Sequence, residues 1–236
     1  MLNIDENMHY EYENLSIETR VFDIIDERMY IIRCNGSIFI VDPFVDKTLI
    51  EEAGRHDEVS VFLTHEHFDH ISGVNALREV TNLTVYGSKV CAEYVKDEKR
   101  NFTKRFPLLF LTDRDKMLRA REYVREAYEC SVDISFEDEL CITWNGHSFK
   151  MVKSPGHSAG SSMMVVDNNL LFSGDSVLGN EQELRSLNAS REDFHRYVVK
   201  RIKAMDGDNI VFPGHGERDV LSEFIKKIDA YPSELT

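Results

Sequence analysis

The segment THEHFDH at 64–70 constrains this chain more strongly than any other stretch of its sequence. It places His65, His67, Asp69 and His70 within six consecutive positions, directly after an apolar run of strand length. Residues two apart on an extended chain point the same way, so His65 and His67 can hold one cation. The turn that follows can direct Asp69 and His70 toward a second cation. A loop of unrelated polar surface residues is the alternative, and it does not account for this density of ligand side chains.

Three further candidate ligands stand in turns of small residues, each after a strand-like run. His157 lies in SPGHSAGSS, Asp175 in LFSGDSV and His215 in VFPGHG. Glycine accompanies each of them, and it adopts sharp turns without the steric penalty of a Cβ atom. Imidazole and carboxylate ligands suit Zn²⁺, and also Fe or Mn where carboxylates are plentiful. We therefore expect two divalent metal ions, with zinc favoured over iron or manganese.

The pattern of apolar runs predicts two β-rich halves with helices, separated by an insert. Strands are expected at 21–25, 29–34, 37–42, 58–64, 83–88, 139–144, 147–154, 161–166, 169–175 and 209–213, and helices at 48–55, 72–80, 89–100, 115–130, 191–205 and 218–230. The stretch 95–135 is expected to be a mostly helical insert. This order suits two sheets packed face to face and covered on the outside by helices, an α+β four-layer αββα sandwich.

Length and charge limit the classes of protein and partner. A chain of 236 residues can form one large domain with a substantial core, so we expect a single domain over 1–236. Its 28 basic and 42 acidic residues leave a net charge of −14, which would repel a polyanion. Nucleic acid is therefore not an expected partner, and a small-molecule substrate is.

Targeting signals and cysteine usage favour a cytoplasmic location. The acidic start lacks the basic and apolar regions of a secretory signal, and no window approaches the roughly 20 apolar residues of a membrane span. Cys34, Cys91, Cys130 and Cys141 show no C-x-x-C spacing, so we expect free buried thiols rather than disulfides.

The motifs H-x-H-x-D-H, P-G-H-S-x-G-S, S-G-D and P-G-H-G occur in this order between Asp42 and Gly216. Together they resemble the metallo-β-lactamase superfamily, which includes glyoxalase II-like hydrolases, and so imply the metallo-β-lactamase fold. The resemblance also implies that Asp42, in VDPF, lies beside the ligands. It implies one metal held by His65, His67 and His157, a second held by Asp69, His70 and His215, and Asp175 as a bridge between them.

A dinuclear site of this kind predicts hydrolysis. Two cations about 3.5–4 Å apart would share a water, lower its pKa toward about 7 and supply a bridging hydroxide as the nucleophile. Asp69 is the candidate catalytic residue, since it is placed to orient the water or relay a proton. The expected substrate is a thioester, lactone or related ester. A phosphodiesterase and a persulfide dioxygenase with a single iron are the alternatives, and a binding protein without activity is disfavoured by seven intact ligands.

The insert carries a local excess of positive charge. Between Lys96 and Arg125 there are ten Lys or Arg and five Asp or Glu. If the insert overhangs the site, these groups would concentrate anions, so an anionic substrate is a hypothesis. A solvated helix face is the alternative and the more common case. The run FPLLF at 106–110 is either a hydrophobic lid or part of the core, and the core is favoured.

Overall fold

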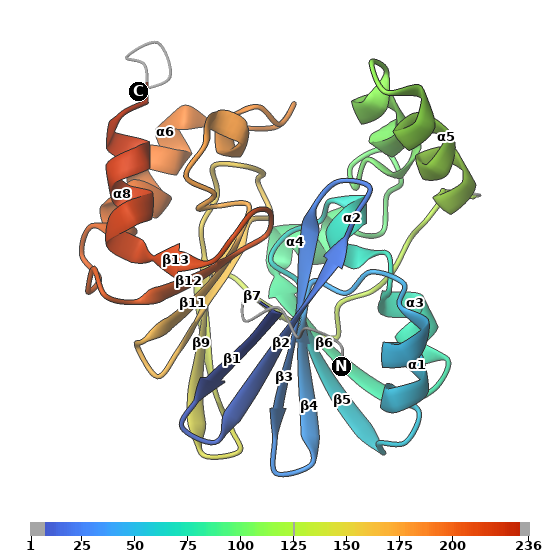
Figure 1. Cartoon of the computed structure of the whole chain (residues 1–236), viewed down its shortest axis with the longest axis horizontal. Helices are drawn as coiled ribbons and strands as arrows, with labels where there is room; N and C mark the ends of the chain where they lie inside the picture. The colour runs from blue at the N-terminus through green and yellow to red at the C-terminus, as the bar shows by residue number, and fades with distance from the viewer. Residues whose placement is uncertain (1–7, 125, 232–236) are drawn as a thin grey trace, which may run out of the picture.

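The computed structural model describes residues 8–124 and 126–231, and its main feature is a pair of mixed β-sheets (Figure 1). The first sheet contains, in sheet order, β1 (His9–Tyr12), β2 (Leu15–Phe22), β3 (Glu27–Cys34), β4 (Ser37–Val41), β5 (Glu58–Phe62), β6 (Asn82–Ser88) and β7 (Ile134–Phe136). The second has the order β13-β12-β11-β10-β9-β8, formed by β8 (Glu139–Trp144), β9 (His147–Lys153), β10 (Ser162–Val166), β11 (Leu170–Gly174), β12 (Ile210–Pro213) and β13 (Asp219–Val220).

Helices cover the outer face of each sheet, and the helices of the insert extend beyond the ends of the strands (Figure 1). They are α1 (Lys47–Ala53), α2 (Phe68–Ile71), α3 (Val74–Arg78), α4 (Lys89–Tyr94), the 3₁₀ helix η2 (Thr103–Phe110), α5 (Arg114–Tyr123), the 3₁₀ helix η3 (Glu181–Leu184), α6 (Arg191–Asp193), the π-helix η4 (Phe194–Val199), α7 (Lys200–Ile202) and α8 (Leu221–Asp229). In Figure 1, α1 and α3 lie outside the first sheet, and α6 and α8 lie on the side of the second. The predicted αββα sandwich is confirmed.

Three apolar clusters fill the three interfaces between these four layers. Phe39 of β4 and Phe172 of β11 belong to the cluster between the sheets. Ile40, the next residue of β4, belongs to the cluster beneath the helices of the first half. Phe224 of α8 belongs to the cluster outside the second sheet. Strands covered on both faces read as continuous apolar runs, which explains why these strands show little alternation.

Tight turns place the strands as the sequence predicts. Asn35 and Gly36 have φ of 49° and 77°, and Asn145 and Gly146 have φ of 51° and 91°. Two consecutive residues with positive φ form the type I′ turn, which matches the twist of antiparallel strands. Both Asn-Gly pairs therefore close hairpins, β3–β4 and β8–β9, as predicted.

Several predicted boundaries are wrong. The strand expected at 21–25 is the end of β2, which begins at Leu15 and ends at Phe22, and β1 was not predicted. The last helix begins at Leu221 because β13 occupies the two residues before it. Cys141 is exposed rather than buried, since β8 lies at the edge of its sheet. The other three thiols are free and buried, as expected.

The insert at 95–135 is helical only over η2 and α5. The helix predicted at 89–100 ends at Tyr94, and the one predicted at 115–130 ends at Tyr123. Hydrogen bonds between the segment after α4 and the segment after α5 explain both endings. The Cys130 N–H donates to the Val95 carbonyl at 3.0 Å. The buried Asn101 amide donates to the Tyr128 carbonyl at 2.7 Å. Pairing between the two segments replaces the hydrogen bonds that longer helices would make.

Chain direction brings the site motifs to one edge of the molecule. β4 and β5 are parallel in the first sheet, and β11 and β12 are parallel in the second. β9 is antiparallel to β10, which is antiparallel to β11, so β9 also runs with them. The turns after all five strands therefore lie at the same end of the sandwich. No helix in the described part of the chain is long and apolar enough to cross a membrane.

Gly73, between α2 and α3, packs directly on the backbone that follows β4. A Cβ atom there would lie 2.5 Å from the Phe44 carbonyl oxygen and 2.9 Å from that of Pro43. We expect Gly73→Ala to lower the free energy of unfolding by about 1–3 kcal/mol, because the crowded atoms are backbone. Gly54→Ala is the matched control, since its Cβ would meet nothing closer than 3.5 Å. Equal urea midpoints for the two variants would contradict this account.

Candidate metal centre

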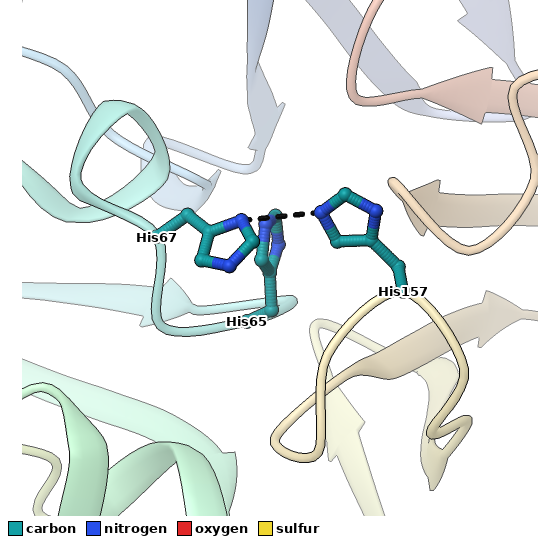
Figure 2. Close-up of side chains that lie close together, drawn as sticks. All are labelled: His65, His67 and His157. Atoms are coloured by element: carbon teal, nitrogen blue, oxygen red, sulfur yellow. Dashed lines mark hydrogen bonds between the residues drawn. The ribbon is translucent and has the colours of Figure 1, made fainter. Parts of the chain in front are cut away.

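Three imidazoles from both sheets form the first group of candidate ligands. His65 and His67 follow β5, and His157 follows β9. One ring nitrogen from each lies within 4.8 Å of the others, and the three rings converge in Figure 2. The Nε2 atom of His157 lies 3.1 Å from the Nδ1 atom of His67. The structure therefore brings these three predicted ligands together.

The second group is formed by Asp69 and His70, around α2, and His215, which follows β12. Asp175 lies between the two groups. Its carboxylate oxygens are 3.5 Å from the Nε2 atoms of His70 and His215. One of them is also 3.4 Å from the Nε2 atom of His157. Asp175 thus lies between the two groups, and the bridging role that the family resemblance implies for it stays a prediction.

Hydrogen bonds fix the orientation of the imidazoles. His70 Nδ1 donates to Asp42 Oδ2 at 3.0 Å, and His157 Nδ1 donates to the Glu183 carbonyl at 3.1 Å. His215 Nδ1 donates to a backbone carbonyl, that of Ile25, at 3.1 Å. Each bond leaves the Nε2 atom directed into the centre. Anchoring one ring nitrogen so that the other is free is the usual support of a metal-binding histidine.

His65 is oriented through a relay. Its Nδ1 donates to Thr64 Oγ1 at 3.1 Å, and that hydroxyl donates to Asp42 Oδ2 at 2.6 Å. The other oxygen of Asp42 accepts the Thr64 N–H at 2.7 Å. Asp42 therefore supports one histidine from each group, beside the ligands as the sequence resemblance implies.

The donor set fits divalent cations. Buried atoms without a hydrogen-bond partner among the described residues include His65 Nε2, His70 Nε2 and Asp175 Oδ1. Each such atom costs about 1–3 kcal/mol unless it is compensated. Two atoms that each lie about 2.1 Å from a tetrahedral zinc ion are about 3.4 Å apart, which matches the spacings around Asp175. Whether the seven side chains bind metal stays a prediction.

Electrostatics support the same assignment. Burial, reinforced by the surrounding imidazoles, lowers the pKa of His65 well below its ordinary value and keeps its lone pair free. Burial would also lower the pKa of His70, but the carboxylates of Asp175 and Asp69 outweigh it and raise that pKa. Burial would raise the pKa of Asp175, but the imidazoles, His215 first, lower it to about 2. The attraction that holds a proton on His70 would equally hold a cation.

Two glycines make room for the centre in different ways. Gly174 has φ of +49°, and a Cβ there would lie 2.2 Å from Thr64 Oγ1. Gly214 lacks a positive φ, but its Cβ would lie 2.2 Å from Asp175 Oδ1. The sequence pattern predicts a sharp turn at both glycines. For Gly214 the reason is instead the close approach of a candidate ligand.

Comparison with known proteins identifies the family. The model of the metallo-beta-lactamase superfamily matches residues 27–215, which include all seven candidate ligands. The chain belongs to this superfamily. The BLEG-1 B3 metallo-beta-lactamase matches its fold with a TM-score of 0.73, at 21% identity, over 93% of this chain and 99% of that one. The crystal structure of TTHA1623 in a di-iron-bound form also matches the fold. Its TM-score is 0.59 at 22% identity, over 84% of this chain and 91% of that one.

Curated relatives are similarly distant. YqgX of Bacillus subtilis, named a probable metallo-hydrolase, is 26% identical over 168 residues, which cover 70% of this chain and 72% of that protein. BaeB of Bacillus velezensis, named a probable polyketide biosynthesis zinc-dependent hydrolase, is 23% identical over 214 residues, 88% of this chain and 80% of that protein.

A cavity of about 390 Å³ opens onto the centre of this superfamily member. His67, Asp69 and Asp175 lie in its lining, together with residues of the insert such as Phe102 and Phe106. The insert therefore overhangs the site. Within the run 106–110, the side chains of Phe106, Pro107 and Phe110 are buried, while Leu108 and Leu109 are exposed.

Two buried acidic residues that shape the site were not predicted from the sequence. Glu183 is buried, and its carboxylate accepts the backbone N–H groups of Leu178 and Gly179. This fixes the carbonyl that orients His157. Glu27 is fully buried behind the centre, and burial raises the pKa of its carboxyl well above the ordinary value. Neither residue stands in a sequence motif. The structure distinguishes them by their burial.

Metal content tests the two groups separately. We expect about two divalent ions per purified chain, about one fewer in His65→Ala and in His215→Ala, and weakened binding of both in Asp175→Ala. Mass spectrometry of dialysed protein measures this directly. His56→Ala is the control, because His56 lies outside the centre. Full metal content in Asp175→Ala would remove the bridging assignment.

Asp42→Asn tests the support of the ligands. Loss of one charged acceptor for His70 and Thr64 should weaken metal affinity by about 10–100-fold, the usual effect of removing such a partner. Competition with a chelator measures the affinity, and Asp57→Asn, an exposed change elsewhere, is the control. An unchanged affinity would mean that Asp42 stabilises the loop around Thr64 but does not contribute to metal binding.

Proposed function

We propose that this protein is a metal-dependent hydrolase that cleaves a thioester, lactone or related ester of a small molecule. The observation that carries the proposal is the position of Asp175, whose carboxylate faces imidazoles of both ligand groups at 3.4–3.5 Å. Asp175 would contribute to the binding of a cation in each group, and a pair of ions held in this way would supply activated water for attack on carbonyl or phosphoryl groups. Seven converging side chains are more than a single ion needs.

The choice of metal follows from the ligands and the relatives. Five imidazoles and two carboxylates suit zinc, and BaeB is named as zinc-dependent. We propose two zinc ions, with iron as the alternative because the structurally similar TTHA1623 binds two irons. When bound, such ions supply Lewis acidity and a water of lowered pKa.

The chain's own residues then have distinct roles. Asp69 is buried and lines the cavity, so one of its carboxylate oxygens can orient the attacking water and accept its proton. Phe102 and Phe106 form apolar walls that exclude bulk water and strengthen the electrostatic interactions inside. The net charge of −14 argues against nucleic acid as a substrate, which favours a small molecule.

Hydrolysis and the role of Asp69 can be tested together. Zinc-loaded protein should hydrolyse at least one member of a panel of thioesters, lactones and phosphodiesters, and Asp69→Ala should lower kcat by about 10²–10⁴-fold on that substrate. Asp115→Ala, an exposed change on α5, is the control and should leave kcat unaltered.

Three results would each contradict a part of the proposal. A single iron per chain with oxygen consumption would indicate a dioxygenase instead of a hydrolase. Activity confined to phosphodiesters would replace the ester substrate while keeping the hydrolytic mechanism. Full activity in Asp69→Ala would remove that residue from catalysis.

A further inference from the structure

Two segments that carry no candidate ligand form the rim of the cavity. The insert contributes Phe102, Arg105 and Leu109, and the segment 182–187 contributes Arg185 and Leu187. Leu109 and Leu187 are 64% and 75% exposed, so large apolar side chains face solvent at the entrance. Apolar surface of this kind beside a cavity indicates where an apolar ligand is received.

Phe102 is held in an unfavourable conformation against a candidate ligand. Its φ of 62° and ψ of 17° are left-handed, a region that costs a bulky residue about 1–3 kcal/mol. The neighbouring Asn101 is fully buried, and its Oδ1 atom accepts hydrogen bonds from the backbone and hydroxyl of Thr103. The Phe102 ring then lies 4.9 Å from the ring of His67. Such strain persists only where surrounding contacts enforce it, which favours a functional role for the ring.

Arg105 forms the outer layer of this stack. Its guanidinium carbon lies 5.4 Å from the Phe102 ring centroid, so it stands within about 10 Å of the His67 ring. Arg185, on the other side of the entrance, is paired with Glu181 at 2.6 Å. Among the described residues, none of the ion pairs involves Arg105. An unpaired guanidinium is suited to bind a carboxylate or phosphate.

We propose that the cavity selects esters or thioesters that carry both an apolar chain and an anionic group. The chain lies along Phe102 and the exposed leucines, the anion meets Arg105, and the scissile carbonyl lies at the metal centre. This deepens the proposed hydrolase function and rests on it for the position of the carbonyl. The anion can belong to the acyl part or to the leaving group of the substrate, since either reaches from the centre to the rim.

Matched thioesters test the selection. In one arm, adipoyl and hexanoyl thioesters of 2-mercaptoethanol differ only in a terminal carboxylate on the acyl chain. In the other, hexanoyl thioesters of 3-mercaptopropionate and 3-mercaptopropionamide differ in the leaving group. We expect the anionic member of at least one pair to have the higher kcat/KM. Arg105→Gln should lower that value about tenfold and leave the neutral member within about twofold.

Lys104→Gln is the matched control, because it removes one positive charge from the same turn without lining the cavity. It should preserve the preference for the anionic thioester. Equal kcat/KM values within both pairs of the wild type, or a preference that Arg105→Gln retains, would overturn the proposal.

A binding measurement separates this inference from hydrolysis itself. Calorimetric titration of zinc-loaded protein compares adipate, which has two carboxylates, with hexanoate, which has one. Tighter binding of adipate that Arg105→Gln abolishes supports the inference even if no thioester is cleaved, in which case the proposed function alone fails. Equal or absent binding of the two acids, together with equal kinetics, rejects the inference while leaving hydrolysis intact.

Discussion

The site depends on the hydrogen bonds that the carboxylate of Asp42 accepts. Asp42 stands at the end of β4 with φ of 53°, outside the conformation of the strand, and accepts hydrogen bonds from Thr64 and His70. Because Thr64 in turn orients His65, one buried anion sets the direction of a histidine in each ligand group. A buried charge is stable only when it is fully hydrogen-bonded, so the loops around it have little freedom to rearrange.

The ligand loops and the sheets were predictable because they depend on local patterns. Two Asn-Gly turns and a series of apolar runs specify the hairpins and strands, and the small-residue turns mark the ends of strands such as β11 and β12. The seven candidate ligands were found for the same reason, since each stands in such a turn or in the segment 64–70. Convergence of these turns then follows from the direction of the strands in the two sheets.

What the sequence did not reveal depends on contacts between distant residues. The early ends of α4 and α5 follow from hydrogen bonds between Val95, Asn101 and the segment 128–130. The roles of Glu183 and Phe102 likewise depend on partners far away in the chain. Local propensity cannot anticipate such contacts, because it describes only what a segment prefers on its own. Nor could charge counting single out Arg105 among ten basic residues of the insert.

Each ligand group takes two side chains from the first sheet and one from the second, so the centre lies on the seam of the sandwich. A cation bound there would add to the polar bonds that already join the two halves of the chain at this end, such as that from the Tyr30 hydroxyl to the Pro213 carbonyl and that from the Ser162 N–H to the Thr64 carbonyl. Binding to the folded state alone adds stability as the logarithm of free ion concentration. The supply of metal would therefore influence the lifetime of the folded chain as well as its chemistry.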